Sequence, residues 1–148
     1  MRPSRRWTDD EGSASLEFIT AGLVLLVPLV YLVLAVAAIQ GGALAVEGAA
    51  RQAARVFVEA ADETAGEAAA VRALDVALAD HGLAAADAAI AIQCSADPCH
   101  TRRELVTVRI ELTVPLPLVP PALQGSFPVA VPLSAEATQQ VSRFWSGG

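Results

Sequence analysis

The sequence predicts an α+β protein. A long N-terminal transmembrane helix continues as a stalk, and a second, amphipathic helix and a small antiparallel β-sheet head follow it. Three observations lead to this prediction. Residues 18–39 form an uncharged apolar run, helical spacing continues to about residue 81, and residues 104–114 alternate with a period of two. Of the 148 residues, about 100 follow the apolar run, enough for one small domain.

The apolar run from Phe18 to Ile39 contains no charged side chain. At about 1.5 Å per residue it extends roughly 33 Å, enough to cross the hydrocarbon core of a bilayer. One carboxylate, Glu17, stands directly before it, where burial without a partner is costly. Pro28 removes an amide hydrogen within the run, so we expect a kink near it. The run therefore predicts a single membrane span with an acidic residue at its entrance.

The segment Gly12-Ser-Ala-Ser-Leu-Glu17-Phe18 places a glutamate five residues after a glycine, at the start of the apolar helix. It resembles the class III signal of type IV pilins, and most closely that of TadE-like pseudopilins of tight-adherence (Tad/Flp) pilus systems. In that family a prepilin peptidase cuts after the glycine and leaves the apolar helix attached. The resemblance implies that Gly12 precedes the cut, that Ser13 becomes the N-terminus, and that Glu17 is the fifth mature residue.

The resemblance covers about the first 60 residues and extends to the rest only by general layout. Ser13 departs from the large apolar residue that often begins a mature type IV pilin, which favours a minor pilin or pseudopilin over a major pilin. The family implies that Glu17 pairs with the N-terminal amine of a neighbouring subunit during pilus assembly. It implies prepilin peptidase, other pilins or pseudopilins, and pilus assembly platform proteins as partners.

Two other interpretations of this segment stay open. An ordinary secretory signal peptide would use Ala35-Val-Ala37 or Ala43-Leu-Ala45 for cleavage, although its apolar region is usually only about 7–15 residues long. An uncut signal anchor would keep residues 1–12 and leave Glu17 among the lipid headgroups. The chain would then be an anchored extracytoplasmic binding module of a secretion or envelope complex. The mature N-terminal residue distinguishes all three.

The distribution of arginine predicts the topology. Arg2, Arg5 and Arg6 precede the span, and only Arg51 and Arg55 follow soon after it, so the N-terminus is expected to stay cytoplasmic. The expected location is the bacterial inner membrane, with one span, an extracytoplasmic head and, by resemblance, a place in a surface pilus. The expected parts are a leader of residues 1–12, a transmembrane and stalk helix of residues 13–63, and a head of residues 64–148.

The stalk is expected to carry its charges on one side. Glu47, Arg51, Arg55 and Glu59 recur every four residues, which favours i,i+4 ion pairs on a solvated face. The apolar side faces the head or a neighbouring subunit in this prediction and contains Ala50, Ala53, Ala54, Phe57 and Val58. The pair Gly41-Gly42 weakens the helix and predicts a bend just outside the membrane.

A second helix is expected over residues 65–81. Thr64-Ala-Gly-Glu67 has the spacing of a capping box, in which the hydroxyl caps an amide and the glutamate reaches back. Val71, Leu74 and Leu78 follow at helical spacing and predict the buried face. Gly82 suits a C-terminal cap.

Strands are expected over residues 88–94, 104–114 and 129–141. The second has the clearest pattern, because valine, isoleucine and leucine alternate with polar residues from residue 106 to residue 114. The segment 115–128 is rich in proline, which disfavours a central strand there. Ala135, Ala137 and Gln139 are expected on one face of the last strand, and Phe144-Trp145 in a loose tail.

Cys94 and Cys99 are the two cysteines of the chain, and Asp97-Pro98 between them favours a turn. In an extracytoplasmic domain this arrangement favours a disulfide. Free thiols and a metal site that recruits His81 and His100 are the alternatives, although two cysteines with one adjacent histidine are a poor zinc spacing. His81 is expected at an exposed helix end, and His100 in a polar turn.

The sequence offers no support for catalysis. It contains no phosphate-binding loop, no nucleophile elbow and no CxxC pair, so we expect no enzyme, no cofactor, no metal and no small-molecule substrate. The net charge of −6 argues against nucleic acid as a partner. A structural or assembly protein is the preferred class, and an anchored binding module is the alternative.

Overall fold

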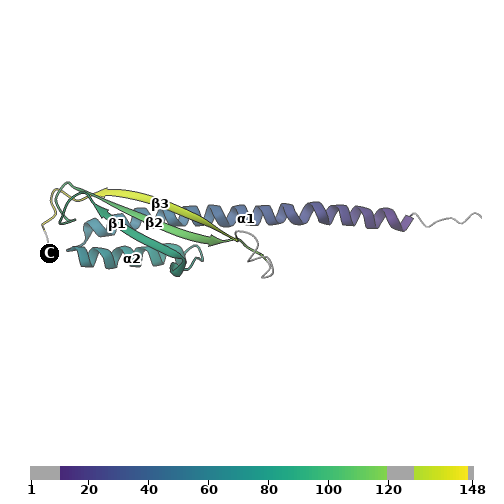
Figure 1. Cartoon of the computed structure of the whole chain (residues 1–148), viewed down its shortest axis with the longest axis horizontal. Helices are drawn as coiled ribbons and strands as arrows, with labels where there is room; N and C mark the ends of the chain where they lie inside the picture. The colour runs from purple at the N-terminus through teal and green to yellow at the C-terminus, as the bar shows by residue number, and fades with distance from the viewer. Residues whose placement is uncertain (1–10, 120–128, 147–148) are drawn as a thin grey trace, which may run out of the picture.

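The computed structural model describes residues 11–119 and 129–146. It has the expected α+β layout, in which one long helix extends well beyond a head made of helices and a sheet (Figure 1). The described elements are α1 (Glu11–Glu59), α2 (Glu63–Ala79), the short 3₁₀ helix η1 (Ala85–Asp87), β1 (Ala88–Cys94), β2 (Leu105–Pro115) and β3 (Ala130–Gln140).

The three strands form an antiparallel sheet in the order β1-β2-β3. In the centre of the sheet, Ile110 of β2 lies opposite Ile90 of β1 and Ala135 of β3. The central strand alternates between buried and exposed residues, as its period-two pattern predicts. Pro132 lies in the edge strand β3, where a missing amide hydrogen is tolerated.

The core lies between one face of the sheet and the two helices. The second half of α1 supplies mainly alanines, whose small side chains let α2 and the sheet approach its backbone closely. The apolar side predicted for the stalk is buried, and its members are Ala50, Ala53, Ala54, Phe57 and Val58. The opposite side carries the exposed ion pairs Glu47–Arg51 and Arg55–Glu59, as expected. The second half of α1 is therefore part of the head as well as its stalk.

Gly42 has a different role from the one predicted. The helix α1 runs through Pro28 and through Gly41-Gly42 without interruption, so neither the proline nor the glycine pair ends the helix. A Cβ atom at Gly42 would lie 2.6 Å from Cγ2 of Val114 and 2.9 Å from Cδ1 of Leu133. Glycine is required here because the ends of β2 and β3 pack directly on the helix backbone.

The start of α2 corrects the predicted capping box. The N-cap is Asp62, whose carboxylate accepts a hydrogen bond from the amide of Ala65, so the helix begins two residues earlier than expected. Aspartate is as good an N-cap as threonine, and the capping box at Thr64 is wrong. Gly82 ends the helix as predicted, with φ of +67° and hydrogen bonds from Gly82 N–H to Ala79 and from Leu83 N–H to Leu78.

The buried face of α2 also differs by one position from the prediction. Leu74 and Leu78 are buried as expected, but Val71 is exposed. Gly66 and Ala70 continue the buried stripe toward the helix start, and a Cβ atom at Gly66 would lie 2.9 Å from the Phe57 ring. Small residues thus bring the first turns of α2 against α1.

The outer face of the sheet is polar. Arg109 on β2 binds Glu111 on the same strand and Glu136 on β3, with both nitrogen–oxygen distances at 2.9 Å. The hydrogen bonds that Arg109 donates to Glu111, and then to Glu136, raise the pKa of Arg109. Beside them the hydroxyls of Thr107 and Thr138 lie 2.8 Å apart. This face matches the solvated side predicted for an antiparallel sheet.

Candidate processing and assembly site

The residues around the predicted cleavage point lie at the start of the described part of α1. The helix is described from Glu11 onward, so the Gly12–Ser13 bond is helical. Arg2, Arg5 and Arg6, which were predicted to set the topology, lie outside the described residues.

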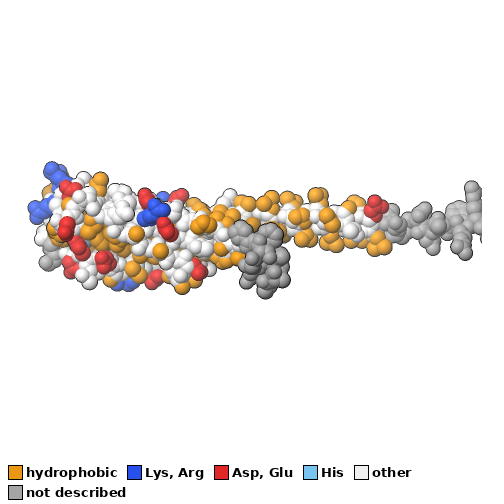
Figure 2. All heavy atoms as spheres, in the orientation of Figure 1, with side chains coloured by type: hydrophobic (Ala, Val, Ile, Leu, Met, Phe, Trp, Pro, Cys, Tyr) orange, Lys and Arg blue, Asp and Glu red, His pale blue; other side chains and the backbone are white. Residues whose placement is uncertain are grey.

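The first half of α1 exposes large apolar side chains on all its faces. Its most apolar 18-residue window has a mean hydropathy of 2.8, and only 6% of that window is buried. Figure 2 shows this part as a narrow apolar rod that projects from a head dotted with charges. A helix that is apolar all round has to be covered by lipid or protein, and this one is long and apolar enough to span a membrane.

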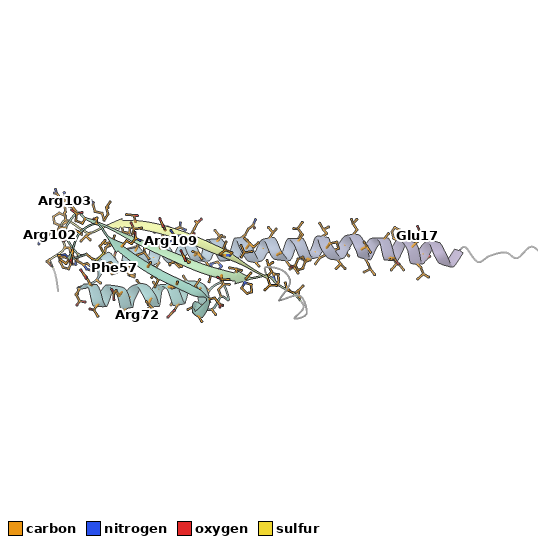
Figure 3. The ribbon with its side chains drawn as sticks, viewed as in Figure 1. Glu17, Phe57, Arg72, Arg102, Arg103 and Arg109 are labelled. Carbon is orange, nitrogen blue, oxygen red and sulfur yellow. A yellow bond between two sulfur atoms is a disulfide. The ribbon has the colours of Figure 1, made fainter. Side chains whose placement is uncertain are left out.

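Glu17 is exposed near the start of this rod (Figure 3). One turn further, the hydroxyl of Thr20 donates to the carbonyl of Leu16 at 2.7 Å, so this polar side chain is satisfied within its own helix. Glu17 has no hydrogen-bond or ion-pair partner among the described residues. Ser13 lies one turn before Glu17, so an amine created at Ser13 would be on the same side of the helix. The carboxylate is thus available to a group outside this chain or to its own new N-terminus.

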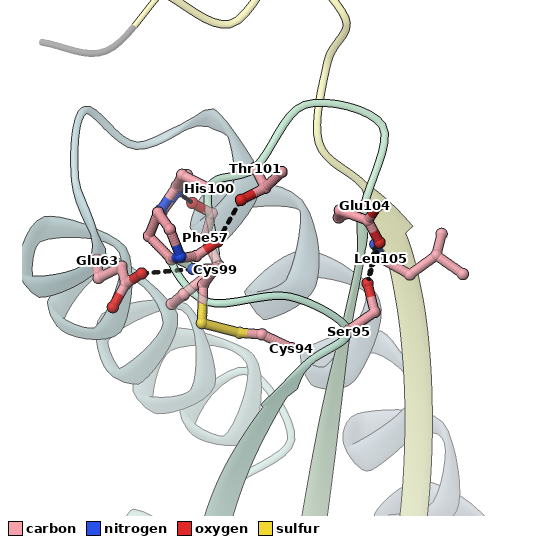
Figure 4. Close-up of a disulfide and its surroundings, with 10 residues drawn as sticks. Phe57, Glu63, Cys94, Ser95, Cys99, His100, Thr101, Glu104 and Leu105 are labelled. Carbon is pink, nitrogen blue, oxygen red and sulfur yellow. Dashed lines mark hydrogen bonds between the residues drawn. A yellow bond between two sulfur atoms is a disulfide. The ribbon is translucent and has the colours of Figure 1, made fainter.

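The far end of the head is closed by the disulfide between Cys94 and Cys99. The sequence predicted this bridge, and the loop between β1 and β2 contains the expected Asp97-Pro98. The amide of Cys99 donates to the carboxylate of Glu63 at the start of α2 (Figure 4). The disulfide loop is thereby attached to both the sheet and the second helix.

His100 lies in a turn, as predicted, but its side chain is buried and not in a polar setting. Its side chain is 3% exposed and stacks between Phe57 and Trp145, with ring centroids 5.0 Å and 5.2 Å away. Its Nε2 lies 2.8 Å from the carbonyl oxygen of Phe57, so Nε2–H donates to the last turn of α1. Its Nδ1 has no partner among the described residues. The ring thus gives a second hydrogen bond to a carbonyl in the last turn of α1, which also accepts from the amide of Ala60 at 3.2 Å.

Trp145 also corrects the prediction of a loose tail. Its indole nitrogen donates to the carbonyl of Ala60 at 3.0 Å, and its own carbonyl accepts from Nε of Arg102 at 2.7 Å. Trp145 packs beside the cluster of Phe57 and Val141, whereas its neighbour Phe144 is exposed as expected. In the sequence, His100 was singled out only because it follows Cys99. Nothing in the local pattern identified Phe57 and Trp145 as the rings that stack on it.

Among the described residues, no three histidine, cysteine, aspartate or glutamate side chains are grouped to hold a metal ion. His81 is exposed beyond the end of α2, as predicted, and lies at the opposite end of the helix from the disulfide loop. The disulfide leaves neither cysteine as a thiol ligand. The two candidate sites are therefore the start of α1 around Glu17 and the end of the head that holds the Cys94–Cys99 disulfide and His100.

Comparison with known proteins gives no match to a family model, to a curated protein or to a solved structure.

Proposed function

We propose that the chain is a minor pilin or pseudopilin that assists assembly of a tight-adherence-type pilus. The observation that carries this proposal is the start of α1, where an exposed apolar helix bears one unpaired carboxylate five residues after a glycine. A prepilin peptidase would cut after Gly12 on the cytoplasmic side, and the helix would hold the head outside the inner membrane. The other pilins and the assembly platform would be its partners.

The physical argument concerns the cost of moving Glu17 into a pilus. A carboxylate in a low-dielectric surrounding needs a partner of opposite charge, and the charged amine of Ser13 on a neighbouring subunit supplies one. The uncut chain has no amine at that position. Cleavage would therefore convert an anchored protein into one able to associate through its helix.

Glu17→Gln tests the assembly role, with Glu47→Gln on the same helix as the matched control. Glu17→Gln removes a charge that the membrane disfavours, so insertion and cleavage should remain intact. Piliation and cross-linking to partner pilins should be lost, while Glu17→Asp should show a partial defect because its carboxylate is one methylene shorter. Glu47→Gln affects only an exposed ion pair with Arg51 and should assemble normally.

Normal piliation and unchanged cross-linking in Glu17→Gln would reject the assembly role. That result would favour the alternative function, in which the chain is an uncut, permanently anchored binding module of a secretion or envelope complex. A defect shared by Glu17→Gln and Glu47→Gln would mean that general loss of charge, and not pairing at the helix start, is responsible.

A further inference from the structure

The segment from the end of β2 to the first half of β3 has no charged side chain. Residues 112–135 contain no aspartate, glutamate, lysine, arginine or histidine, although 18% of the chain is charged. The described part of this segment includes residues 116–119, which follow β2 directly, and residues 129–131 at the start of β3. Leu118 is 75% exposed there, beside the partly buried Leu116 and Val119.

The direction of β2 places residues 116–119 toward the predicted membrane. The strand begins near the end of α1, where Val106 packs with Phe57 and Val58, and it reaches Gly42 at Val114. It therefore runs back along α1, and the residues that follow it lie still closer to the apolar half. Figures 1 and 2 show this end of the sheet where the broad head meets the narrow rod.

The length of α1 relates this end of the head to the bilayer. A bilayer has a hydrocarbon core of about 30 Å and measures about 40–45 Å with its headgroups. At about 1.5 Å per residue, a core that begins at Glu17 ends near residue 37, and the outer headgroup layer reaches about Gly42. The next charged residue on the helix, Glu47, lies about 45 Å from Glu17 and so stands in water. Residues 116–119, beyond the contact at Gly42, fall within the headgroup layer.

The backbone of Leu118 is an independent observation. Its φ of 58° lies in the left-handed region, which glycine and asparagine adopt far more readily than leucine. A leucine at this position strains the backbone, and its side chain is three-quarters exposed, so its contacts within the head do not explain its presence. An apolar environment outside the head would explain it.

We propose that residues 116–119 insert into the outer leaflet of the membrane, with Leu118 at the boundary between headgroups and acyl chains. The head then has two membrane contacts, the span and this loop, which fix its rotation about α1. Among the described residues, the charged side chains beside Leu112 and Leu133 are Asp87, Arg109 and Glu111. Arg109 is held in ion pairs with Glu111 and Glu136, so attraction to anionic lipids does not contribute. The proposal rests on the membrane insertion of α1 in the proposed function, and it requires neither cleavage nor pilus assembly.

Depth-dependent quenching in vesicles tests the insertion. The full chain is reconstituted in phosphatidylcholine vesicles and carries an environment-sensitive fluorophore at Leu118→Cys, attached without reductant so that the native disulfide stays closed. Phe144→Cys is the matched control, because Phe144 is also 75% exposed but lies at the far end of the head. In brominated lipid the label at position 118 should lose most of its emission, and the label at position 144 should lose none.

Leu25→Cys reports the span itself. Because the label at position 118 replaces the leucine, a label at Val119→Cys beside the native leucine is measured as well. Quenching at position 25 with water-like signals at both positions 118 and 119 would overturn the proposal and leave the membrane anchor intact. No quenching at position 25 would remove the anchor, and the proposal would fail together with it. Partial replacement by phosphatidylglycerol, or added salt, should leave the quenching at position 118 unchanged. Quenching at position 118 that requires the anionic lipid would also overturn the proposal, because it would show binding by charge.

Leu118→Asn shows that the apolar side chain is responsible. Asparagine suits a φ of 58°, so the head should keep its secondary structure and its disulfide. A label at Val119→Cys should then lose most of its quenching compared with the same label beside the native leucine. Equal quenching in both backgrounds would show that Leu118 does not hold the loop in the leaflet, against the proposal.

Discussion

The two halves of α1 belong to one continuous helix but use opposite side chains. The first half, residues 15–34, carries leucine, valine and phenylalanine that are exposed on all faces. The second half, residues 45–58, buries alanines beneath the sheet and α2, together with Val46, Phe57 and Val58. In a helix of a water-soluble domain, the large apolar side chains usually face the core, and the side that faces water is polar or carries small residues.

The size and exposure of the side chains suit the two halves of α1 to different surroundings. In the head, alanine lets two other layers approach the helix backbone, so the side chains from β2 and α2 fill the space. In the first half nothing in the described chain covers the side chains, and bulk is favourable only if lipid or another protein surrounds it. One helix thus contributes to the core of a domain and also forms a rod long and apolar enough to span a membrane.

Phe57 and Phe18 allow the sharpest comparison, because the same substitution can be made in each half. Phe57 is 1% exposed and Phe18 is 80% exposed. Phe57→Ala should lower the free energy of unfolding of the head by about 3–5 kcal/mol, as for other buried phenylalanines. Phe18→Ala should leave it unchanged. Denaturant unfolding of the detergent-solubilised chain, followed through Trp145, measures both, and equal effects would contradict the division of α1.

The disulfide should have the next largest effect. Replacing Cys94 and Cys99 together by serine removes a short closed loop, which should lower the free energy of unfolding by about 2 kcal/mol. The same loss should follow treatment of the native chain with a reductant. The first half of α1 should remain inserted in membranes in both cases. Loss of membrane association would show that the head and the rod are not independent.

Gly42 and Gly48 test the close approach of the sheet to the second half of α1. Gly42→Ala places a methyl group against Val114 and Leu133 and should cost about 1 kcal/mol, because Leu133 can shift only partly. A methyl group at Gly48 meets no atom within 4 Å, so Gly48→Ala should stabilise the helix by up to about 1 kcal/mol. Opposite shifts in thermal midpoint are expected, and a gain at both positions would be inconsistent with tight packing at Gly42.

Arg51 should show the smallest effect. Its ion pair with Glu47 is exposed, with the two charged groups 3.3 Å apart. Arg51→Ala should therefore change the free energy of unfolding by no more than about 0.5 kcal/mol, and salt should reduce the difference. A larger loss that salt does not affect would assign Arg51 a packing role that its exposure does not suggest.

The elements that a local pattern specifies were predictable from the sequence. The long apolar helix, the buried side of the stalk, the strand around Ile110 and the Cys94–Cys99 bridge each follow from periodicity or spacing within a few residues. The role of Gly82 at the end of α2 was also predictable from the local sequence, because the positive φ needed there favours glycine.

Most of what the sequence did not predict depends on contacts distant in the sequence. The N-cap is an exception, because Asp62 accepts from the amide of Ala65 only three residues away. The burial of His100 was not predicted, because its partners Phe57 and Trp145 lie more than 40 residues away on either side. Gly42 was assigned to a bend because the strand ends that pack against it cannot be read from the helix itself.

The N-terminal residue of the membrane-bound protein tests the central claim, that the rod is a processed, pilin-like membrane helix. The chain is produced together with the prepilin peptidase of its own pilus system, extracted from membranes and measured by intact mass. The account predicts a protein that begins at Ser13, and a Gly12→Leu variant that keeps residues 1–12. A native chain that keeps Met1 would contradict the account in favour of a plain anchor, and a start beyond Ala35 would replace the membrane helix with an ordinary signal peptide.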